Sequence, residues 1–316
     1  MTVIAFVFPG QGSQTVGMGK ELSELFPSVS NHFQVADQIL QFSLSNMIFN
    51  GPKEELTLTK NAQPALLTTS MAILSRLQHF NIQPSYVAGH SLGEYSALVA
   101  AGVLSFEDAL LVVRKRGEFM EEAVPAGEGS MAAVLGMELS VLETLTANIS
   151  GEGYPVQIAN INCPGQIVIS GSKEGVEKAC ILAKDIGAKR AIPLQVSGPF
   201  HSSLMEPASG KLRIAFEQLK WKNPKVPIVS NVTAQAETSS DDIKNLLIQQ
   251  LYLPVRWQEC IEQMIEKGVD TFIEIGPGNV LAGLIRKINR NVRVFSVSTE
   301  DDVQEVVRFL KEEQIS

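Results

Sequence analysis

Strand-like apolar runs alternate along most of this 316-residue chain with segments whose apolar residues recur at helical spacing. The strand-like runs lie at residues 2–8, 86–88, 226–230 and 271–275, and the helical segments at 64–80, 92–101, 106–123, 206–219, 241–251 and 256–267. Pro64 suits the first turn of its helix, and Ser105 suits the N-cap of helix 106–123. Such alternation indicates βαβ units, so we expect an α/β fold with a mainly parallel sheet.

The order of elements changes between residues 129 and 196. Here we expect strands at 131–135, 156–161, 166–170 and 190–196, and helices at 140–149 and 172–186. This βαββαβ order is that of a ferredoxin-like unit. We therefore divide the chain into a core, residues 1–128 and 197–316, and an inserted small subdomain, residues 129–196.

Charge and apolar content exclude several classes of protein. The chain has 26 Lys and Arg against 34 Asp and Glu, a net charge of −8, so it lacks the cationic surplus of a nucleic-acid-binding protein. No apolar run approaches the roughly 18 residues of a membrane span, and the N-terminus lacks the basic start of a signal peptide. Cys163, Cys180 and Cys260 fit neither a disulfide framework nor a zinc site. We expect a cytoplasmic protein that binds neither nucleic acid nor membranes.

The strongest chemical signal is Gly89-His90-Ser91-Leu92-Gly93, which lies between a strand and a helix. G-x-S-x-G in this context is the nucleophile elbow, a tight turn that holds a serine hydroxyl exposed at the end of a sheet. The N-terminus of the following helix stabilises negative charge that develops beside the serine. Chance is the alternative for so short a pattern, and the flanking strand and helix argue against it. Ser91 is the candidate nucleophile.

A nucleophilic serine needs a base, and the chain offers four histidines. His32 and His79 lie in partly polar helical stretches, which favours structural or surface roles, and we expect His90 to pack around the elbow. His201 follows Gly198-Pro199-Phe200 in a loop downstream of the serine, which is the chain order of elbow hydrolases. We take His201 as the base. No aspartate stands in a convincing position for a triad acid, so a backbone or amide carbonyl could orient the imidazole.

A glycine-rich loop, Pro9-Gly10-Gln11-Gly12, follows the first strand. It is not a dinucleotide fingerprint, because residue 15 is Thr15, and it lacks the Lys-Ser/Thr of a phosphate-binding loop. A plain turn between strand and helix is the alternative. Beside an elbow, such a loop can bring donors to an oxyanion, and Gln11 is the candidate donor.

Three consecutive basic residues, Arg114, Lys115 and Arg116, lie on the helix after the elbow helix. A run of charges is usually solvated, as we expect for Arg114 and Lys115. Only one of three consecutive helical residues can point toward a given site, and spacing alone does not choose among them. A buried arginine would clamp a substrate carboxylate in bidentate fashion.

Together these motifs resemble one known family. The matching segments, in family order, are Phe8-Pro9-Gly10-Gln11-Gly12-Ser13-Gln14, Gln63-Pro64-Ala65, Gly89-His90-Ser91-Leu92-Gly93-Glu94-Tyr95, Arg116-Gly117, Gly198-Pro199-Phe200-His201 and Glu274-Ile275-Gly276-Pro277-Gly278. They are similar to the malonyl-CoA:acyl carrier protein transacylases of bacterial type II fatty acid synthesis. The resemblance implies an α/β-hydrolase-like parallel-sheet core with a ferredoxin-like insert. It also implies transfer of malonyl from malonyl-CoA to the phosphopantetheine thiol of holo acyl carrier protein, without a cofactor or metal.

The resemblance further implies a role for each site residue. Ser91 would carry the malonyl group as an ester, and His201 would be the general base, held by a main-chain carbonyl near Gln250. Gln11 and the Leu92 N–H would form the oxyanion hole. Arg116 would bind the malonyl carboxylate. The other implied pocket residues are Gln63, Phe200, which is associated with preference for malonyl over methylmalonyl groups, Asn160 and Asn162.

Carrier proteins of this system are acidic, so we expect a local basic patch to dock the carrier on this acidic chain. The candidate residues are Lys189, Arg190, Arg286, Lys287 and Arg290. We expect a monomer. Three alternatives stay open: a serine esterase or thioesterase that discharges the acyl group to water, a non-catalytic nucleotide- or CoA-binding module, and an acyltransferase that serves a polyketide synthase.

Overall fold

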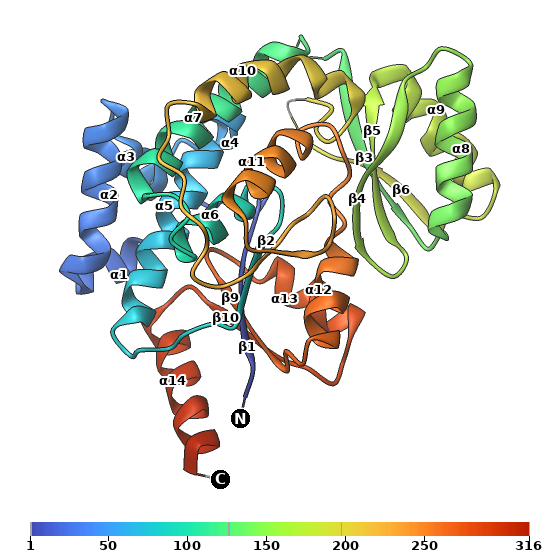
Figure 1. Ribbon diagram of the computed structural model, residues 1–316. Coiled ribbons are helices and arrows are strands. Elements are labelled where there is room, and N and C mark those ends of the chain that lie inside the picture. The colour runs from blue at the N-terminus through green and yellow to red at the C-terminus, as the bar shows by residue number, and fades with distance from the viewer. Residues whose placement is uncertain (1, 126, 197, 316) are drawn as a thin grey trace.

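The computed structural model describes residues 2–125, 127–196 and 198–315 and contains two sheets (Figure 1). Met1, Ala126, Ser197 and Ser316 lie outside the described residues, and Ser197 is where we expect the second core segment to begin. The two ends of the chain lie at the same end of the molecule (Figure 1), where Thr2 Oγ1 donates a hydrogen bond to Glu313 Oε2 at 3.1 Å.

The larger sheet has six strands, and all but one of them run parallel. They are β1 (Ile4–Phe8), β2 (Tyr86–Gly89), β7 (Ile228–Val229), β8 (Ala236–Glu237), β9 (Thr271–Ile275) and β10 (Arg293–Val297), in the spatial order β10-β9-β1-β2-β7-β8. Only β8 is antiparallel to its neighbour. In β1, Ile4, Phe6 and Phe8 pack on one face of the sheet, and Ala5 and Val7 pack on the other. Because both faces are covered, the strand is apolar throughout, which explains the unbroken run in the sequence.

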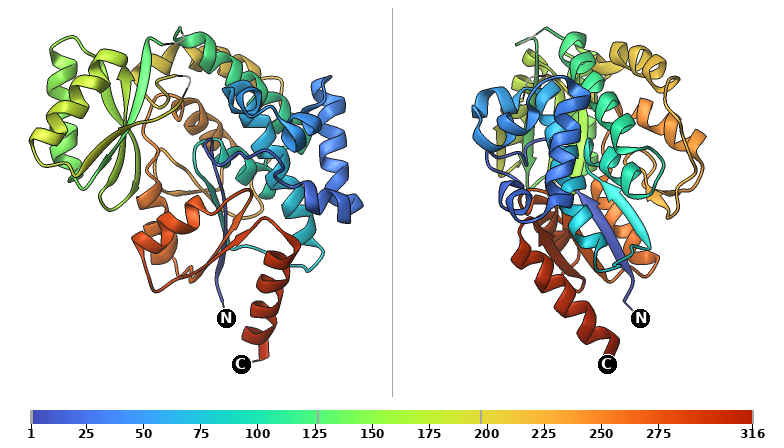
Figure 2. Two further views of the ribbon diagram at one scale, coloured as in Figure 1. Left: turned by 180° about the vertical axis from the view of Figure 1, so that it is seen from behind. Right: turned by 90° about the vertical axis from the view of Figure 1, so that its left-hand side faces the viewer.

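Helices cover both faces of this sheet (Figure 2). The hydrophobic cluster on the Phe6 side includes residues of α1 (Lys20–Leu25), α2 (Pro27–Leu40), α3 (Leu44–Asn50), α4 (Lys53–Thr57), α5 (Thr59–Gln78), α6 (Gly93–Ala100), α7 (Phe106–Ala123), the 3-10 helix η1 (Ser203–Met205), α10 (Glu206–Phe216), α11 (Ser240–Gln249) and α14 (Glu300–Ile315). The cluster on the opposite side is formed with α12 (Trp257–Glu266) and α13 (Val280–Ile288).

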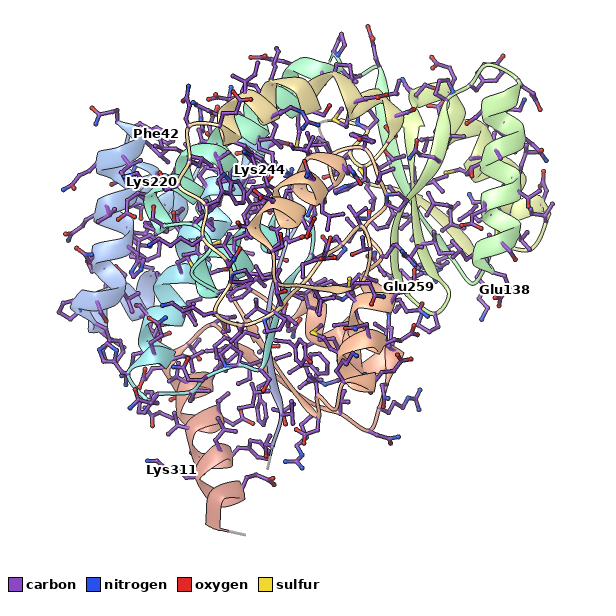
Figure 3. The ribbon with its side chains drawn as sticks, viewed as in Figure 1. Phe42, Glu138, Lys220, Lys244, Glu259 and Lys311 are labelled. Carbon is purple, nitrogen blue, oxygen red and sulfur yellow. The ribbon has the colours of Figure 1, made fainter. Side chains whose placement is uncertain are left out.

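The smaller sheet is antiparallel and lies beside the core. Its strands are β3 (Gly129–Leu135), β4 (Val156–Cys163), β5 (Gln166–Ser172) and β6 (Arg190–Pro193), in the order β4-β5-β3-β6. Helices α8 (Leu139–Gly151) and α9 (Lys173–Asp185) cover one face of this sheet with a separate apolar cluster. The chain order is βαββαβ, as the sequence predicts. In Figure 3, Glu138 before α8 and Lys311 in α14 lie at opposite ends of the molecule.

Most predicted elements are present, with boundaries shifted by a few residues. Helix 106–123 is confirmed as α7, and its Ser105 Oγ accepts a hydrogen bond from the Asp108 N–H at 3.0 Å. Strand 190–196 is too long, because β6 ends at Pro193. Helices α1 to α4, helix α13 and strands β8 and β10 lie outside the elements that the sequence predicts. All of them except α2, which has 14 residues, are nine residues long or shorter, so their apolar patterns are brief.

The prediction for Pro64 is wrong, because α5 begins at Thr59 and Pro64 lies inside the helix. A proline there has no N–H for the carbonyl four residues earlier, which belongs to Lys60. Arg114 Nη1 donates to that carbonyl at 3.0 Å instead. A contact between two helices therefore satisfies the carbonyl, and no local sequence rule could reveal it.

The carboxyl ends of β1, β2, β7 and β9 meet at one edge of the large sheet, where parallel α/β folds place their sites. The loop after β1 packs tightly against the turn after β2. A Cβ on Gly93 would lie 2.1 Å from the Phe8 carbonyl oxygen, so only glycine fits. Among the described residues, no helix is both long and apolar enough to cross a membrane.

Candidate active site

Ser91 occupies the turn between β2 and α6 with φ 51°, in the left-handed region that a non-glycine residue rarely adopts. Asn231, which follows β7, holds this turn from the neighbouring strand. Its Oδ1 accepts from the Ser91 N–H at 2.7 Å, and its Nδ2 donates to the Gly89 carbonyl at 2.8 Å. One side chain thus fixes both ends of the strained turn and the direction of the serine hydroxyl.

His201 lies against Ser91, although 110 residues separate them in the sequence. Its Nε2 is 2.8 Å from Ser91 Oγ, and its Nδ1 is 2.7 Å from the main-chain oxygen of Gln250. A carbonyl can only accept, so Nδ1 carries the proton and Nε2 is free to accept the serine proton. His201 also has a left-handed backbone, with φ 57°.

Burial, followed by the nearby Arg116 charge, lowers the pKa of His201 to about 3. The imidazole is therefore neutral at pH 7, as a general base must be before reaction. The orienting group is a carbonyl rather than a carboxylate, which is consistent with the lack of a convincing triad aspartate in the sequence.

Of the three consecutive basic residues, only Arg116 reaches the serine. Its Nη2 lies 3.4 Å from Ser91 Oγ, and the side chain is 1 % exposed. Nη1 donates to Gln63 Oε1 at 2.8 Å and Nη2 to Gln250 Oε1 at 3.0 Å. Both contacts are to neutral amides, and burial lowers the pKa of Arg116.

Arg114 is not the solvated residue that we expected. It is partly buried and donates to Asn61 Oδ1 and to the carbonyl of Lys60, besides its ion pair with Glu118. Lys115 is exposed. Arg114 therefore joins α7 to α5 and has a structural role.

Two backbone N–H groups, those of Gln11 and Leu92, are candidate donors to an oxyanion. Within the described part of the chain, neither the Gln11 N–H nor the Leu92 N–H has a hydrogen-bond acceptor. Leu92 directly precedes α6, so its N–H lies at a helix N-terminus. The side-chain amide of Gln11 donates to Thr59 Oγ1 at 3.0 Å, which fixes this side chain beside the cavity.

These groups surround a cavity of about 130 Å³ between the core and the small sheet. Its lining includes Gln11, His90, Ser91, Arg116, Met120, Met131, Asn160, Phe200 and His201. The other predicted site residues lie behind this lining. Leu92, Gln63 and Gln250 are buried beneath it, and Asn162 accepts from His90 Nε2 at 2.9 Å.

The sequence motifs do not predict the contributions of His90, Asn231 and Glu94 to the site. His90 was expected only to pack around the elbow, and it does stack edge-on against Trp257, but it also lines the cavity. Asn231 carries a weaker sequence signal, that of a polar residue just after a predicted strand. Glu94 is 2 % exposed, and its signal is a charge within an otherwise apolar helical stretch.

No group of three or more His, Cys, Asp or Glu side chains within the described ranges could hold a metal ion. The polar groups at the cavity are instead a hydroxyl, an imidazole, a guanidinium, amides and backbone N–H groups. This set suits nucleophilic acyl chemistry on a substrate that carries a negative charge.

Comparison with known proteins identifies one family along nearly the whole chain. Residues 5–314 match the family described as acyl transferase domain. A malonyl CoA-acyl carrier protein transacylase of Bacillus subtilis is 58% identical over 313 residues, which cover 99% of each chain. A protein of the same name from Staphylococcus aureus is 47% identical over 96% of this chain and 98% of its own.

Solved structures identify the same family. An acyl carrier protein S-malonyltransferase of Vibrio cholerae superposes with a TM-score of 0.94 at 45% identity, covering 96% of this chain and 100% of that one. A malonyl-transacylase in complex with a type II PKS acyl-carrier protein superposes with a TM-score of 0.95 at 42% identity, covering 97% and 99%. The chain belongs to the acyl transferase family, among the malonyl-CoA:acyl carrier protein transacylases.

Proposed function

We propose that this acyltransferase moves the malonyl group from malonyl-CoA to the phosphopantetheine thiol of an acyl carrier protein, in fatty acid synthesis, through a malonyl ester on Ser91. One observation carries the proposal. The hydroxyl of Ser91 lies 2.8 Å from a neutral imidazole and 3.4 Å from a buried guanidinium. The imidazole can activate the hydroxyl, and the guanidinium can bind an acyl group that ends in a carboxylate.

In the first half-reaction, Ser91 Oγ attacks the thioester carbonyl carbon while His201 Nε2 takes the hydroxyl proton. The carbonyl of Gln250 stabilises the imidazolium through Nδ1–H. The backbone N–H groups of Gln11 and Leu92 stabilise the oxyanion of the tetrahedral intermediate. The C–S bond then breaks, the departing CoA thiolate takes the proton from His201, and the malonyl ester remains.

The second half-reaction runs through the same groups. His201 takes the proton of the carrier's phosphopantetheine thiol as its sulfur attacks the ester carbonyl. The C–O bond to Ser91 breaks, and His201 returns the proton to Oγ. Two half-reactions on one nucleophile give ping-pong kinetics, and these steps need no cofactor.

Arg116 selects the acyl group by binding the malonyl carboxylate. Gln63 and Gln250 hold the guanidinium from behind, so its position is set before substrate arrives. Phe200 lines the cavity. A bulky ring at this position would leave less room for a branched acyl group, so we propose that it favours malonyl. Asn160 lines the cavity directly, whereas Asn162 contributes by holding His90.

We propose that the acidic carrier docks on the basic patch of Lys189, Arg190, Arg286, Lys287 and Arg290, all of which are exposed. The hairpin β4–β5 lies between the Lys189 and Arg190 part of the patch and the part on and after α13. Lys287 Nζ lies 3.4 Å from Gln166 Oε1, and Leu135 pairs with both Gln166 and Arg190 in the small sheet. The patch therefore spans the small sheet and α13.

Three proposals concern the organisation of the enzyme. The separate apolar cluster of the small sheet supports a core of 1–128 and 197–316 with a subdomain of 129–196. Every group in the mechanism comes from one chain, which supports a monomer. Cys163, Cys180 and Cys260 are free thiols, which supports a reducing, cytoplasmic location.

The test is to incubate the enzyme with malonyl-CoA, with and without holo carrier protein, and to identify the products by chromatography. We expect malonyl-carrier when the thiol is present and little free malonate when it is absent. Equal release of malonate in both arms would show a hydrolase instead. The Ser91→Ala variant should be inactive in both arms, and full activity would exclude the serine ester.

A further inference from the structure

Glu94 lies in the first turn of α6, directly beneath the nucleophile turn, and is a buried carboxylate that the mechanism above does not use. A single oxygen, Oε2, accepts from the Asn231 N–H at 3.1 Å and from Gln250 Nε2 at 2.8 Å. Its partners are thus the residue that clamps the Ser91 turn and the residue whose carbonyl holds His201.

The side-chain amide of Gln250 joins Glu94 to Arg116. Its Nε2 donates to Glu94, and its Oε1 accepts from Arg116 Nη2 at 3.0 Å. Within the described ranges, no carboxylate forms an ion pair with Arg116. A buried guanidinium without an opposite charge is strongly unfavourable. Glu94 lies across one amide from it and attracts it electrostatically.

We propose that Glu94 is a positioning residue that acts through Gln250: it holds the Arg116 guanidinium in place before an acyl group binds, and its charge limits how strongly the pocket binds a carboxylate-bearing acyl group. This inference rests on the proposed role of Arg116. A malonyl carboxylate must compete with Glu94 for the same guanidinium, whereas an acetyl group does not.

The substitution Glu94→Gln isolates this charge. The amide oxygen of glutamine can take the place of Oε2 and accept both hydrogen bonds, so shape and pairing are kept while the charge is lost. One unit charge at roughly 7 Å, at an effective dielectric constant near 20, changes the binding of an anion by about tenfold or more. We expect the ratio of kcat/KM for malonyl-CoA to that for acetyl-CoA to rise by about tenfold at pH 8.

The unmodified enzyme supplies a second measurement. Burial raises the pKa of Glu94 to about 7, so its charge disappears as the pH falls from 8 to 6. The other titratable groups that face it are Arg116, Glu237, Tyr95 and Cys260. Burial raises the pKa values of Tyr95 and Cys260, so neither group ionises in this range. The malonyl-to-acetyl ratio should therefore rise as the pH falls, and Glu94→Gln should remove this dependence.

Glu274→Gln is the matched control. Glu274 is also a fully buried carboxylate, but it caps α13 by accepting from the N–H groups of Leu281 and Ala282 at 3.0 and 2.9 Å. This variant should lose stability while keeping the acyl ratio and its pH dependence. If Glu94 had only a structural role, Glu94→Gln would likewise lose stability while keeping the acyl ratio and its pH dependence.

The experiment measures the malonyl-to-acetyl ratio of kcat/KM at pH 6 and at pH 8, after thermal melts establish folding. The four proteins compared are the unmodified enzyme, Glu94→Gln, Glu274→Gln and Arg116→Ala. A raised, pH-independent ratio in Glu94→Gln alone supports the inference. An unchanged ratio in Glu94→Gln, with malonyl preference lost in Arg116→Ala, overturns the inference and leaves the proposed function intact. Malonyl preference retained in Arg116→Ala overturns the proposed carboxylate site itself. If Glu94→Gln does not fold, a ratio that is flat with pH in the unmodified enzyme overturns the inference.

Discussion

Replacement of Arg116 by alanine removes the group that we propose selects the acyl chain. The guanidinium is 1 % exposed and donates to Gln63, Gln250 and Ser91 Oγ. The substitution leaves two amide oxygens without their donor in a buried site, and each unmet hydrogen bond costs about 1–3 kcal/mol. We therefore expect lower stability together with a change of specificity, and the two effects must be measured separately.

The magnitude of the specificity change follows from burial. A carboxylate about 4 Å from a unit charge, at an effective dielectric constant near 20, gains about 4 kcal/mol of electrostatic energy. Desolvation of the carboxylate removes part of this gain, which leaves a preference of about 2–4 kcal/mol for malonyl over acetyl. At about 1.4 kcal/mol per factor of ten, this preference is roughly 30-fold to 1,000-fold in kcat/KM.

The assay compares kcat/KM for malonyl-CoA and for acetyl-CoA, with holo carrier protein as the acceptor. Arg116→Ala should bring the two values to within a few fold of each other, mainly through loss of malonyl transfer. Arg114→Ala is the control, since Arg114 lies on the same helix, is partly buried and points toward α5. It should lower stability and keep the preference. A folded Arg116→Ala variant with the original preference would refute the role of Arg116.

Three further predictions concern the buried network. Below pH 6.5 the unfolded chain protonates His201, whereas the folded enzyme, in which its pKa is about 3, does not, so the contribution of His201 to the free energy of unfolding should fall by about 1.4 kcal/mol per pH unit. In denaturant titrations the stability difference between the unmodified enzyme and His201→Ala should change by this amount per pH unit, and a difference that stays constant with pH would contradict it. For Glu94 the sign is opposite, because its pKa of about 7 in the folded enzyme exceeds the value of 4.5 in the unfolded chain. The stability that Glu94 contributes is therefore lost as the pH rises toward 7. In denaturant titrations at pH 8, Glu94→Gln should be more stable than the unmodified enzyme by up to about 3 kcal/mol. Equal stabilities there would show that Glu94 is not strained by burial. Asn231→Ala should lower kcat by about 10-fold to 100-fold, because both ends of the turn around Ser91 lose their clamp, and normal turnover in a folded variant would show that the turn holds itself.

The elements of the fold that could be predicted are those whose signal is local. The strand at the N-terminus is an unbroken apolar run because both of its faces are buried, and helix α7 begins at a serine cap. The start of α5 could not be predicted, because the arginine that satisfies the carbonyl of Lys60 comes from a residue 54 positions away. Tertiary contact overrides the local preference of proline there.

The candidate site, like the fold, contains residues that a local pattern reveals and residues that only tertiary contact reveals. Ser91 could be found because the elbow is a local turn with its own glycine requirement, and His201 because few histidines compete with it. The carbonyl of Gln250 could be reached only through the family resemblance, since every residue carries a carbonyl. Asn231 pairs with the serine across 140 residues, and that pairing arises only once β2 and β7 lie side by side.

The covalent intermediate is the central claim, and intact-mass spectrometry tests it most directly. Enzyme mixed with malonyl-CoA should gain the mass of one malonyl group on the peptide that contains Ser91, and holo carrier protein should then return it to its original mass while the carrier gains the group. Ser91→Ala should show no gain at any time. An enzyme that transfers malonyl without ever gaining mass, or that gains it at another residue, would contradict the account.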